Sequence, residues 1–276
     1  MRFIIIASER TGSSHLVNVL SGHPDIFTNG NVFDARKPKL VYVLWPDKTA
    51  ATKLELSELR RTAPLEFLER IFSTGYGRAH VGFKIFSGEN DEILDQLIKD
   101  STVRKIVLYR RNLLACFSSH LVAASTGKYS ARDEANAAPA PKVRFNVERF
   151  ANFHKRFTSF YRDVVERLNH HRQNFYFCSY EEINDPWLRS SLVNFIGADP
   201  GVPMSSDVQL RHQVKQNSSD ILSRFANRRE AAAFLTEYGL WHWAHEGDMS
   251  LEPFIPRAET SPEFPAEREG HELART

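Results

Sequence analysis

The sequence is poor in several features that mark particular classes of protein. Only two of its 276 residues are cysteine, so it offers neither a disulfide framework nor the cysteine spacing of a metal site. Its 36 basic and 34 acidic side chains almost balance, which argues against a surface that follows a nucleic-acid backbone. No apolar stretch approaches the roughly 20 residues of a membrane span. We therefore expect no metal, no nucleic-acid partner and no transmembrane segment.

The chain also lacks a recognisable export signal. The apolar run at its start, Phe3 to Ala7, is too short for the core of a signal peptide. Cys116 and Cys178 lie in apolar patterns, and buried free thiols are simplest in a reducing compartment. With 42% hydrophobic and 25% charged residues, the composition allows one substantial core. We expect a cytoplasmic protein folded as a single domain over residues 1–276.

What is present at the N-terminus is a strand, a loop and a helical pattern. The unpaired N–H groups of a first helical turn and the positive end of the helix dipole form an anion site. An ordinary serine-rich helix cap has a similar pattern. The loop favours a phosphate-ester ligand because its side chains add donors around a glycine: Arg10, Thr11, Gly12, Ser13 and Ser14.

The same loop lacks the features needed to split ATP. A P-loop NTPase carries G-x-x-x-x-G-K-[ST], in which the Lys reaches the β- and γ-phosphates and the hydroxyl holds magnesium. Here Ser13 and Ser14 follow Gly12, and the Lys is missing. A P-loop kinase that uses ATP is therefore the disfavoured alternative.

A second strand-to-helix junction carries two arginines. The apolar run from Lys105 to Tyr109 is followed by Arg110 and Arg111 and then by a helical pattern. Ser119 lies eight residues after Arg111, so about two helical turns bring its hydroxyl to the side of the helix entrance. One phosphate can then contact both side chains. Arg110 and Ser118 have the same spacing, but the Arg-Asn pair favours Arg111.

Together, the two junctions resemble those of the PAPS-dependent sulfotransferases, in particular the bacterial carbohydrate branch with the trehalose and nodulation-factor enzymes. The resemblance implies that residues 8–14 bind the 5′-phosphosulfate end of PAPS (3′-phosphoadenosine 5′-phosphosulfate). It implies that Arg111 and Ser119 bind its 3′-phosphate. Arg suits this role because its planar guanidinium binds phosphate at two points and stays charged. The implied reaction moves a sulfuryl group from PAPS to a hydroxyl of a carbohydrate or glycolipid.

Weaker similarities extend the resemblance over most of the chain. Arg10 occupies the loop position where relatives place Lys or Arg against the leaving group, and Lys84 is interpreted as assisting from a neighbouring strand. Lys215 matches a basic position before the last helices. The segments that carry these similarities are Gly22-His23-Pro24-Asp25, Gly82-Phe83-Lys84, Ser179-Tyr180-Glu181-Glu182 and Lys215-Gln216.

One departure from the family concerns the catalytic base. Many relatives carry an acidic residue in a G-E-x-F motif, assigned as the base that takes the acceptor proton, whereas this chain has Asn31 there. An amide cannot accept that proton. Either another residue serves, or the acceptor needs little activation, or the chain is a PAPS- or PAP-binding paralogue with little turnover. The residues considered as the base are Glu9, His15, Asp34 and His120, of which His15 is the catalytic candidate.

The order of elements predicts a P-loop-like three-layer α/β/α fold with a central parallel sheet of about five strands. Continuous apolar runs are typical of strands covered on both faces. Binding is then expected at the carboxyl ends of the strands, where both loops fall. The predicted strands are 3–7, 40–45, 80–86, 105–109 and 174–179. The predicted helices are 13–21, 54–73, 90–99, 112–124, 147–170, 186–196 and 219–238.

Two segments lack such patterns. Residues 127–144 are interpreted as a lid loop over the acceptor pocket, because a long connection without secondary structure is usually mobile or functional. Residues 251–276, with several Pro among Glu and Arg, are interpreted as an extended tail. Trp241 and Trp243 are expected to be core residues rather than sugar platforms. Because the trehalose-type relatives dimerise, the resemblance also implies a homodimer.

Overall fold

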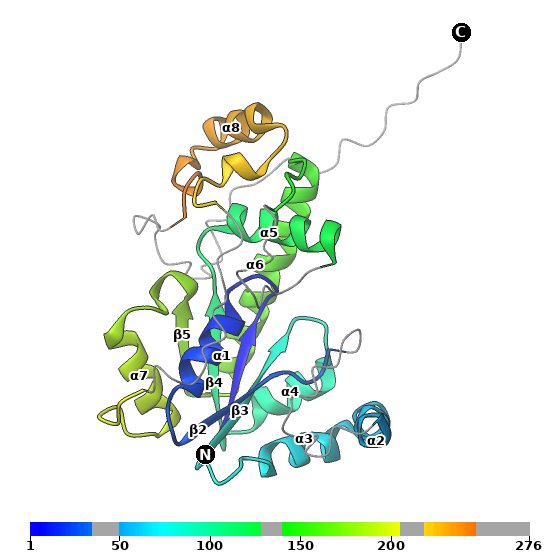
Figure 1. Cartoon of the computed structure of the whole chain (residues 1–276), viewed down its shortest axis with the longest axis vertical. Coiled ribbons are helices and arrows are strands. Elements are labelled where there is room, and N and C mark those ends of the chain that lie inside the picture. The colour runs from blue at the N-terminus through cyan, green and yellow to red at the C-terminus, as the bar shows by residue number, and fades with distance from the viewer. Residues whose placement is uncertain (35–49, 128–139, 205–217, 247–276) are drawn as a thin grey trace. The chain divides into compact units, whose positions relative to one another are not determined.

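The computed structural model describes residues 1–34, 50–127, 140–204 and 218–246 (Figure 1). They form two compact units. The first holds the described residues of Met1–Arg111 and Val164–Val214, and the second those of Asn112–Tyr129, Ala137–Asp163 and Lys215–Thr276. The boundary falls within helix α6 (Val147–His170), after Asp163. The single domain stays a prediction.

The first unit is built on a five-stranded parallel sheet with the order β2-β3-β1-β4-β5. Phe3 and Ile5 of the central strand pack with Leu16 of α1 and Leu192 of α7 in one buried cluster. Because side chains alternate along a strand, Ile4 faces the other side, where it is also fully buried. This confirms the α/β class with helices on both sides of a parallel sheet. The strands are β1 (Arg2–Ala7), β2 (Ile26–Asn31), β3 (His80–Phe86), β4 (Val103–Tyr109) and β5 (Phe175–Ser179).

The order of the strands places a topological switch point between β1 and β4. These two strands are neighbours in the sheet. After β1 the chain continues to β2 at one edge of the sheet, whereas after β4 it continues to β5 at the opposite edge. In open parallel sheets, ligands bind outside the carboxyl ends of the strands at such a point. Both loops singled out in the sequence begin there. The helices of this unit are α1 (Ser13–Ser21), α2 (Ala50–Thr62), α3 (Pro64–Ser73), α4 (Asp91–Lys99) and α7 (Pro186–Ile196), with the short 3-10 helix η2 (Tyr180–Glu182).

Several predicted elements are corrected. The second strand is β2, which was missed because its Asn-Gly pair is typical of a turn; the strand predicted at 40–45 lies outside the described residues. The helix predicted at 54–73 is two helices, because Pro64 lacks the N–H that would continue α2 and instead begins α3. In the second unit, the helix predicted at 219–238 is reduced to α8 (Arg228–Glu237), preceded by η3 (Leu222–Arg224).

The second unit has a core of aromatic side chains from α5 (Leu113–Thr126), α6, α8 and η4 (Trp241–Trp243). Trp243 is buried and meets the Phe150 ring edge-on at 5.9 Å. Trp241 is 51% exposed. The expectation of two core tryptophans therefore holds for Trp243 and is wrong for Trp241. Other buried rings of this core include Phe117, Phe145, Phe153, Phe157, Tyr161, Phe225 and Phe234.

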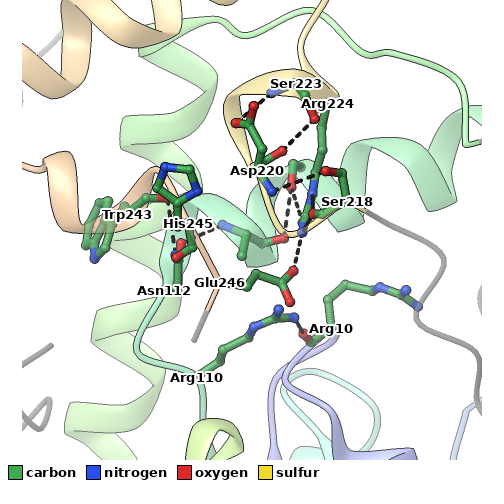
Figure 2. A network of polar contacts seen from close by, with 12 residues as sticks. Arg10, Arg110, Asn112, Ser218, Asp220, Ser223, Arg224, Trp243, His245 and Glu246 are labelled. Atoms are coloured by element: carbon green, nitrogen blue, oxygen red, sulfur yellow. Dashed lines mark hydrogen bonds and ion pairs between the residues drawn. The ribbon is translucent and has the colours of Figure 1, made fainter. Parts of the chain in front are cut away.

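A buried polar network stabilises the same unit (Figure 2). Arg224 forms an ion pair with Glu246, in which the two side chains are 4% and 7% exposed. Arg224 also donates to Ser118 Oγ at 3.1 Å, and Asn112 donates to the His245 carbonyl at 3.0 Å. Breaking one partner of such a buried pair is strongly destabilising. Ser118 is therefore engaged in the interior of the second unit.

Besides the strand predicted at 40–45, three further expectations fall on residues outside the described ranges. They are Lys215, the tail at 251–276 and most of the lid loop at 127–144. None of the helices that the structure describes has the length and hydropathy of a membrane span.

Candidate functional site

The two predicted loops lie side by side at the carboxyl edge of the sheet. Strands β1 and β4 are in parallel register, with Ala7 opposite Leu108 at their ends. Arg110, after β4, donates from Nη1 to the carbonyl of Arg10, after β1, at 3.1 Å. Figure 2 shows the Arg10 guanidinium directed away from this contact. The hydrogen bond joins two corners that are about a hundred residues apart in the sequence.

The first loop is shaped by an unusual backbone. Arg10 and Gly12 both have positive φ, at 67° and 80°. A Cβ at Gly12 would lie 2.1 Å from Cδ2 of Tyr180, so only glycine fits. Thr11 is fully buried and donates from Oγ1 to the carbonyl of Ser8 at 2.8 Å. Gly12 leads directly into α1, whose first-turn N–H groups form the anion site that the sequence predicts.

Lys84 brings a buried positive charge to the same helix terminus. Its side chain reaches from β3 with only 4% of the residue exposed, and Nζ donates to Ser14 Oγ at 2.7 Å and to Ser13 Oγ at 3.3 Å. An ammonium beside the positive end of a helix dipole is unfavourable unless an anion lies between them. The pairing of Lys84 with these serines therefore fits a bound phosphate or sulfate group.

Arg110 is held as part of the framework. Its guanidinium lies 4.3 Å from the centre of the Tyr180 ring, and the residue is 7% exposed. With its other contact to the Arg10 carbonyl, Arg110 links the two corners to the segment after β5. The geometry gives Arg110 a structural role in this edge of the sheet.

Arg111 is positioned by the segment that follows β5. Its guanidinium forms an ion pair with Glu182, and its backbone N–H donates to Glu181 Oε2 at 3.2 Å. Glu182 in turn accepts a hydrogen bond from Ser179 Oγ at 2.7 Å. Burial raises the pKa of the adjacent Tyr109, although its hydrogen bond with Arg111 opposes the shift. The strand-ending Ser-Tyr-Glu-Glu motif thus fixes the arginine proposed for the 3′-phosphate.

Other predicted site residues have mixed outcomes. Ser119 is buried on α5 in the second unit, so its pairing with Arg111 stays a prediction. His15 Nε2 and Asn184 Oδ1 lie 3.0 Å apart, which directs the ring toward the segment after β5. The His120 ring centroid lies 6.0 Å from that of Phe153, in the second unit.

Sequence reasoning missed Glu89, in the turn after β3. Its Oε1 accepts from Asn31 Nδ2 at 2.7 Å, and its Oε2 accepts from the Phe86 N–H at 3.0 Å. The pKa of this carboxyl is raised to about 7: burial is the largest cause and the charges of Asp34 and Glu9 add to it, while the Phe86 N–H and the Lys84 charge oppose it. The available signal was a carboxylate just beyond the carboxyl end of a predicted strand.

Two curated sequences from Rhizobium meliloti, one of them from strain 1021, are both named nodulation protein H. Each is 25% identical to this chain over 248 residues, which cover 84% of this chain and 94% of the relative. This similarity agrees with the PAPS-dependent sulfotransferases, the family that the two loops resemble.

Two solved structures are also similar to this chain. A sulfotransferase from Alicyclobacillus acidocaldarius is 14% identical with a TM-score of 0.44, covering 88% of this chain and 94% of that one. Mouse sulfotransferase SULT7A1 complexed with PAP is 15% identical with a TM-score of 0.43, covering 92% of this chain and 89% of that one. No protein-family model matches the chain.

Proposed function

We propose that this chain is a sulfotransferase that transfers the sulfuryl group of PAPS to a hydroxyl of a carbohydrate or glycolipid. The observation that carries the proposal is the contact between Arg110 and the Arg10 carbonyl, which joins the corners after β1 and β4 at one edge of the sheet. A single PAPS molecule could then bind with its 5′-phosphosulfate at the loop after β1 and its 3′-phosphate at the corner after β4.

The donor set suits a phosphosulfate. PAPS supplies a sulfuryl group attached to a phosphate that leaves as PAP. The transferred group carries less charge than a phosphoryl group, so fixed donors suffice to stabilise the leaving oxygen. We assign that role to Lys84 and the first-turn N–H groups of α1, with Thr11, Ser13 and Ser14 lining the loop and Arg10 as a further cation. Arg111, together with Ser119, is assigned to the 3′-phosphate.

The carbohydrate acceptor is supported by similarity to nodulation protein H over most of both chains. We also propose a cytoplasmic location and a homodimer. The location is supported by Cys116 and Cys178, which are both buried free thiols; burial raises the pKa of Cys178, which keeps it protonated and unreactive. The homodimer rests on the resemblance to the trehalose-type enzymes alone.

Replacing Arg111 with Ala is expected to weaken PAP binding by about 1.5–3 kcal/mol, the range for a hydrogen bond to a charged group. Calorimetry with PAP measures this directly. Arg167→Ala is the matched control, because Arg167 also forms an ion pair in the first unit, with Asp95 at 2.8 Å. Arg111→Lys keeps the charge and loses the two-point geometry, so an intermediate affinity is expected. Unchanged affinity in Arg111→Ala would remove the proposed 3′-phosphate site.

Activity is tested by release of PAP from PAPS in the presence of a panel of sugars, without added magnesium. Sugar-dependent release supports the proposed function. Tight PAP binding with no transfer to any acceptor would identify a binding paralogue with lost turnover. Phosphate transfer from ATP that requires magnesium would identify the kinase alternative.

A further inference from the structure

In the G-E-x-F motif of the relatives, the acidic residue is assigned as the base that takes the proton from the acceptor hydroxyl. This chain has Asn31 at that position, so the motif does not supply the base. The side chain of Asn31 is nevertheless in contact with a carboxylate: its Nδ2 donates to Glu89 Oε1 at 2.7 Å. The turn after β3 thus brings the carboxylate of Glu89 next to the amide of Asn31. We infer that Glu89 accepts the proton of the acceptor hydroxyl during sulfuryl transfer. This inference rests on the proposed function.

The sheet places Glu89 beside the group that binds the sulfuryl donor. Asn31 and Lys84 are opposite each other in the register of β2 and β3, so their side chains lie on the same side of the sheet. Lys84 contacts Ser14 at the start of α1, and Asn31 contacts Glu89. Going from β2 toward β1 along the carboxyl edge of the sheet, the order is therefore the Glu89 carboxylate, the Lys84 ammonium and the proposed phosphosulfate loop. An acceptor that approaches from the β2 side meets the carboxylate next to the donor.

The immediate surroundings of Glu89 suit a proton acceptor. The N–H of Phe86 donates to Oε2 and fixes the carboxyl group, while the amide of Asn31 orients Oε1. Among the described residues, Asn31 Oδ1 is buried without a hydrogen-bond partner, so it can receive a hydroxyl of the acceptor. Among the described residues, the charged groups that face Glu89 are Asp34, Lys84, Glu9 and Arg60 of α2. Burial and the two acids bring its proton affinity into the range in which a general base works near neutral pH.

The proposed step balances as follows. The acceptor oxygen forms a bond to sulfur as the bond from sulfur to the phosphate oxygen of PAPS breaks, and that electron pair stays on the oxygen of PAP. The proton of the acceptor hydroxyl moves to the carboxylate of Glu89. The ammonium of Lys84 contacts Ser14 in the proposed phosphosulfate loop, where it would stabilise the leaving oxygen. Lys84 of β3 thus faces the leaving charge, and Glu89 in the turn after β3 receives the proton.

Glu89→Gln tests the inference, because glutamine mimics the protonated carboxyl and keeps the turn. We expect kcat for PAP release with a sugar acceptor to fall at least about 100-fold, within the range for loss of a general base. PAP affinity by calorimetry is expected to stay within about threefold of wild type. Wild-type kcat is expected to rise with pH through about 7, where the Glu89 carboxyl deprotonates. In Glu89→Gln this rising limb of the pH profile is expected to disappear.

Two further variants separate chemistry from folding. Asp100→Asn is the control, because Asp100 also caps a turn, accepting from the Thr102 N–H at 2.8 Å, but lies before β4 at the opposite edge of the sheet. It is expected to keep wild-type kcat. Glu89→Asp retains a shorter carboxylate and is expected to keep the pH limb at reduced kcat. Urea unfolding at pH 8 checks that Glu89→Gln is folded; because a buried charge is removed, its stability is expected to equal or exceed that of wild type.

The outcomes are distinguishable. If wild type transfers and Glu89→Gln stays within about threefold of its kcat, the inference fails and the proposed function stands. Parallel loss of PAP affinity and kcat would show a structural role and also overturn the inference. If wild type transfers to no acceptor, the proposed function fails, and this inference fails with it.

Discussion

Replacing Lys84 with Met is expected to lower kcat for sulfuryl transfer by about 100- to 1,000-fold, the effect of removing one preorganised donor from a developing negative charge. Nζ of Lys84 lies 2.7 Å from Ser14 Oγ, in a side chain shielded from water, where an electrostatic contact is stronger than at the surface. Methionine fills a similar volume without the charge. Single-turnover PAP release measures the chemical step.

The control for this change is Lys105→Met. Lys105 is a fully buried lysine of β4 whose Nζ donates to Gln173 Oε1 at 2.6 Å, toward the amino end of the sheet. Burial lowers its pKa to about 8. Removing it tests the cost of losing a buried lysine without touching the proposed site, so kcat should stay close to wild type. A Lys84→Met variant as active as Lys105→Met would exclude Lys84 from leaving-group stabilisation.

The second large effect is expected from Gly12→Ala, which should weaken PAP binding at least about 100-fold. Gly12 has a φ of 80°, where a side chain is strained, and the added Cβ would lie 2.1 Å from the Tyr180 ring. Either the loop or the ring must move. Because the Arg110 guanidinium lies over that ring, movement of Tyr180 also disturbs the link to the second corner. Calorimetry with PAP measures the loss.

Gly77→Ala separates strain from steric overlap. Gly77 has a φ of 76°, but a Cβ there would meet no atom within 4 Å. Both variants carry the cost of a left-handed backbone, about 1–2 kcal/mol. Only Gly12→Ala adds the collision, so it should unfold at a lower urea concentration than Gly77→Ala. Equal stability and unchanged PAP affinity would show that the loop has room the structure does not indicate.

The local parts of this site were readable from the sequence because they depend on neighbours along the chain. An apolar run that ends at Ala7, before a loop with Gly12 and two serines, predicts a strand and a helix terminus, and Arg111 follows a second apolar run in the same way. The parallel sheet follows from continuous apolar strands. Strand β2 was missed because its polar Thr28, Asn29 and Asn31 do not form the expected apolar run.

The contacts that depend on the register of the sheet could not be read in the same way. Lys84 meets Ser14, and Asn31 meets Glu89, only because β2, β3 and β1 are neighbours in an order that differs from the order of the chain. The base candidates predicted from the sequence, Glu9, His15, Asp34 and His120, therefore do not include Glu89. The ion pair between Arg111 and Glu182 likewise depends on β5 lying next to β4.

The most direct test of the account is a crystal structure of the chain with PAP. One nucleotide should bridge the two corners, with its 5′-phosphate at the first turn of α1 near Lys84 and its 3′-phosphate on the guanidinium of Arg111. A nucleotide bound elsewhere, or one whose 3′-phosphate makes no contact with Arg111, would contradict the claim that these corners form one binding site.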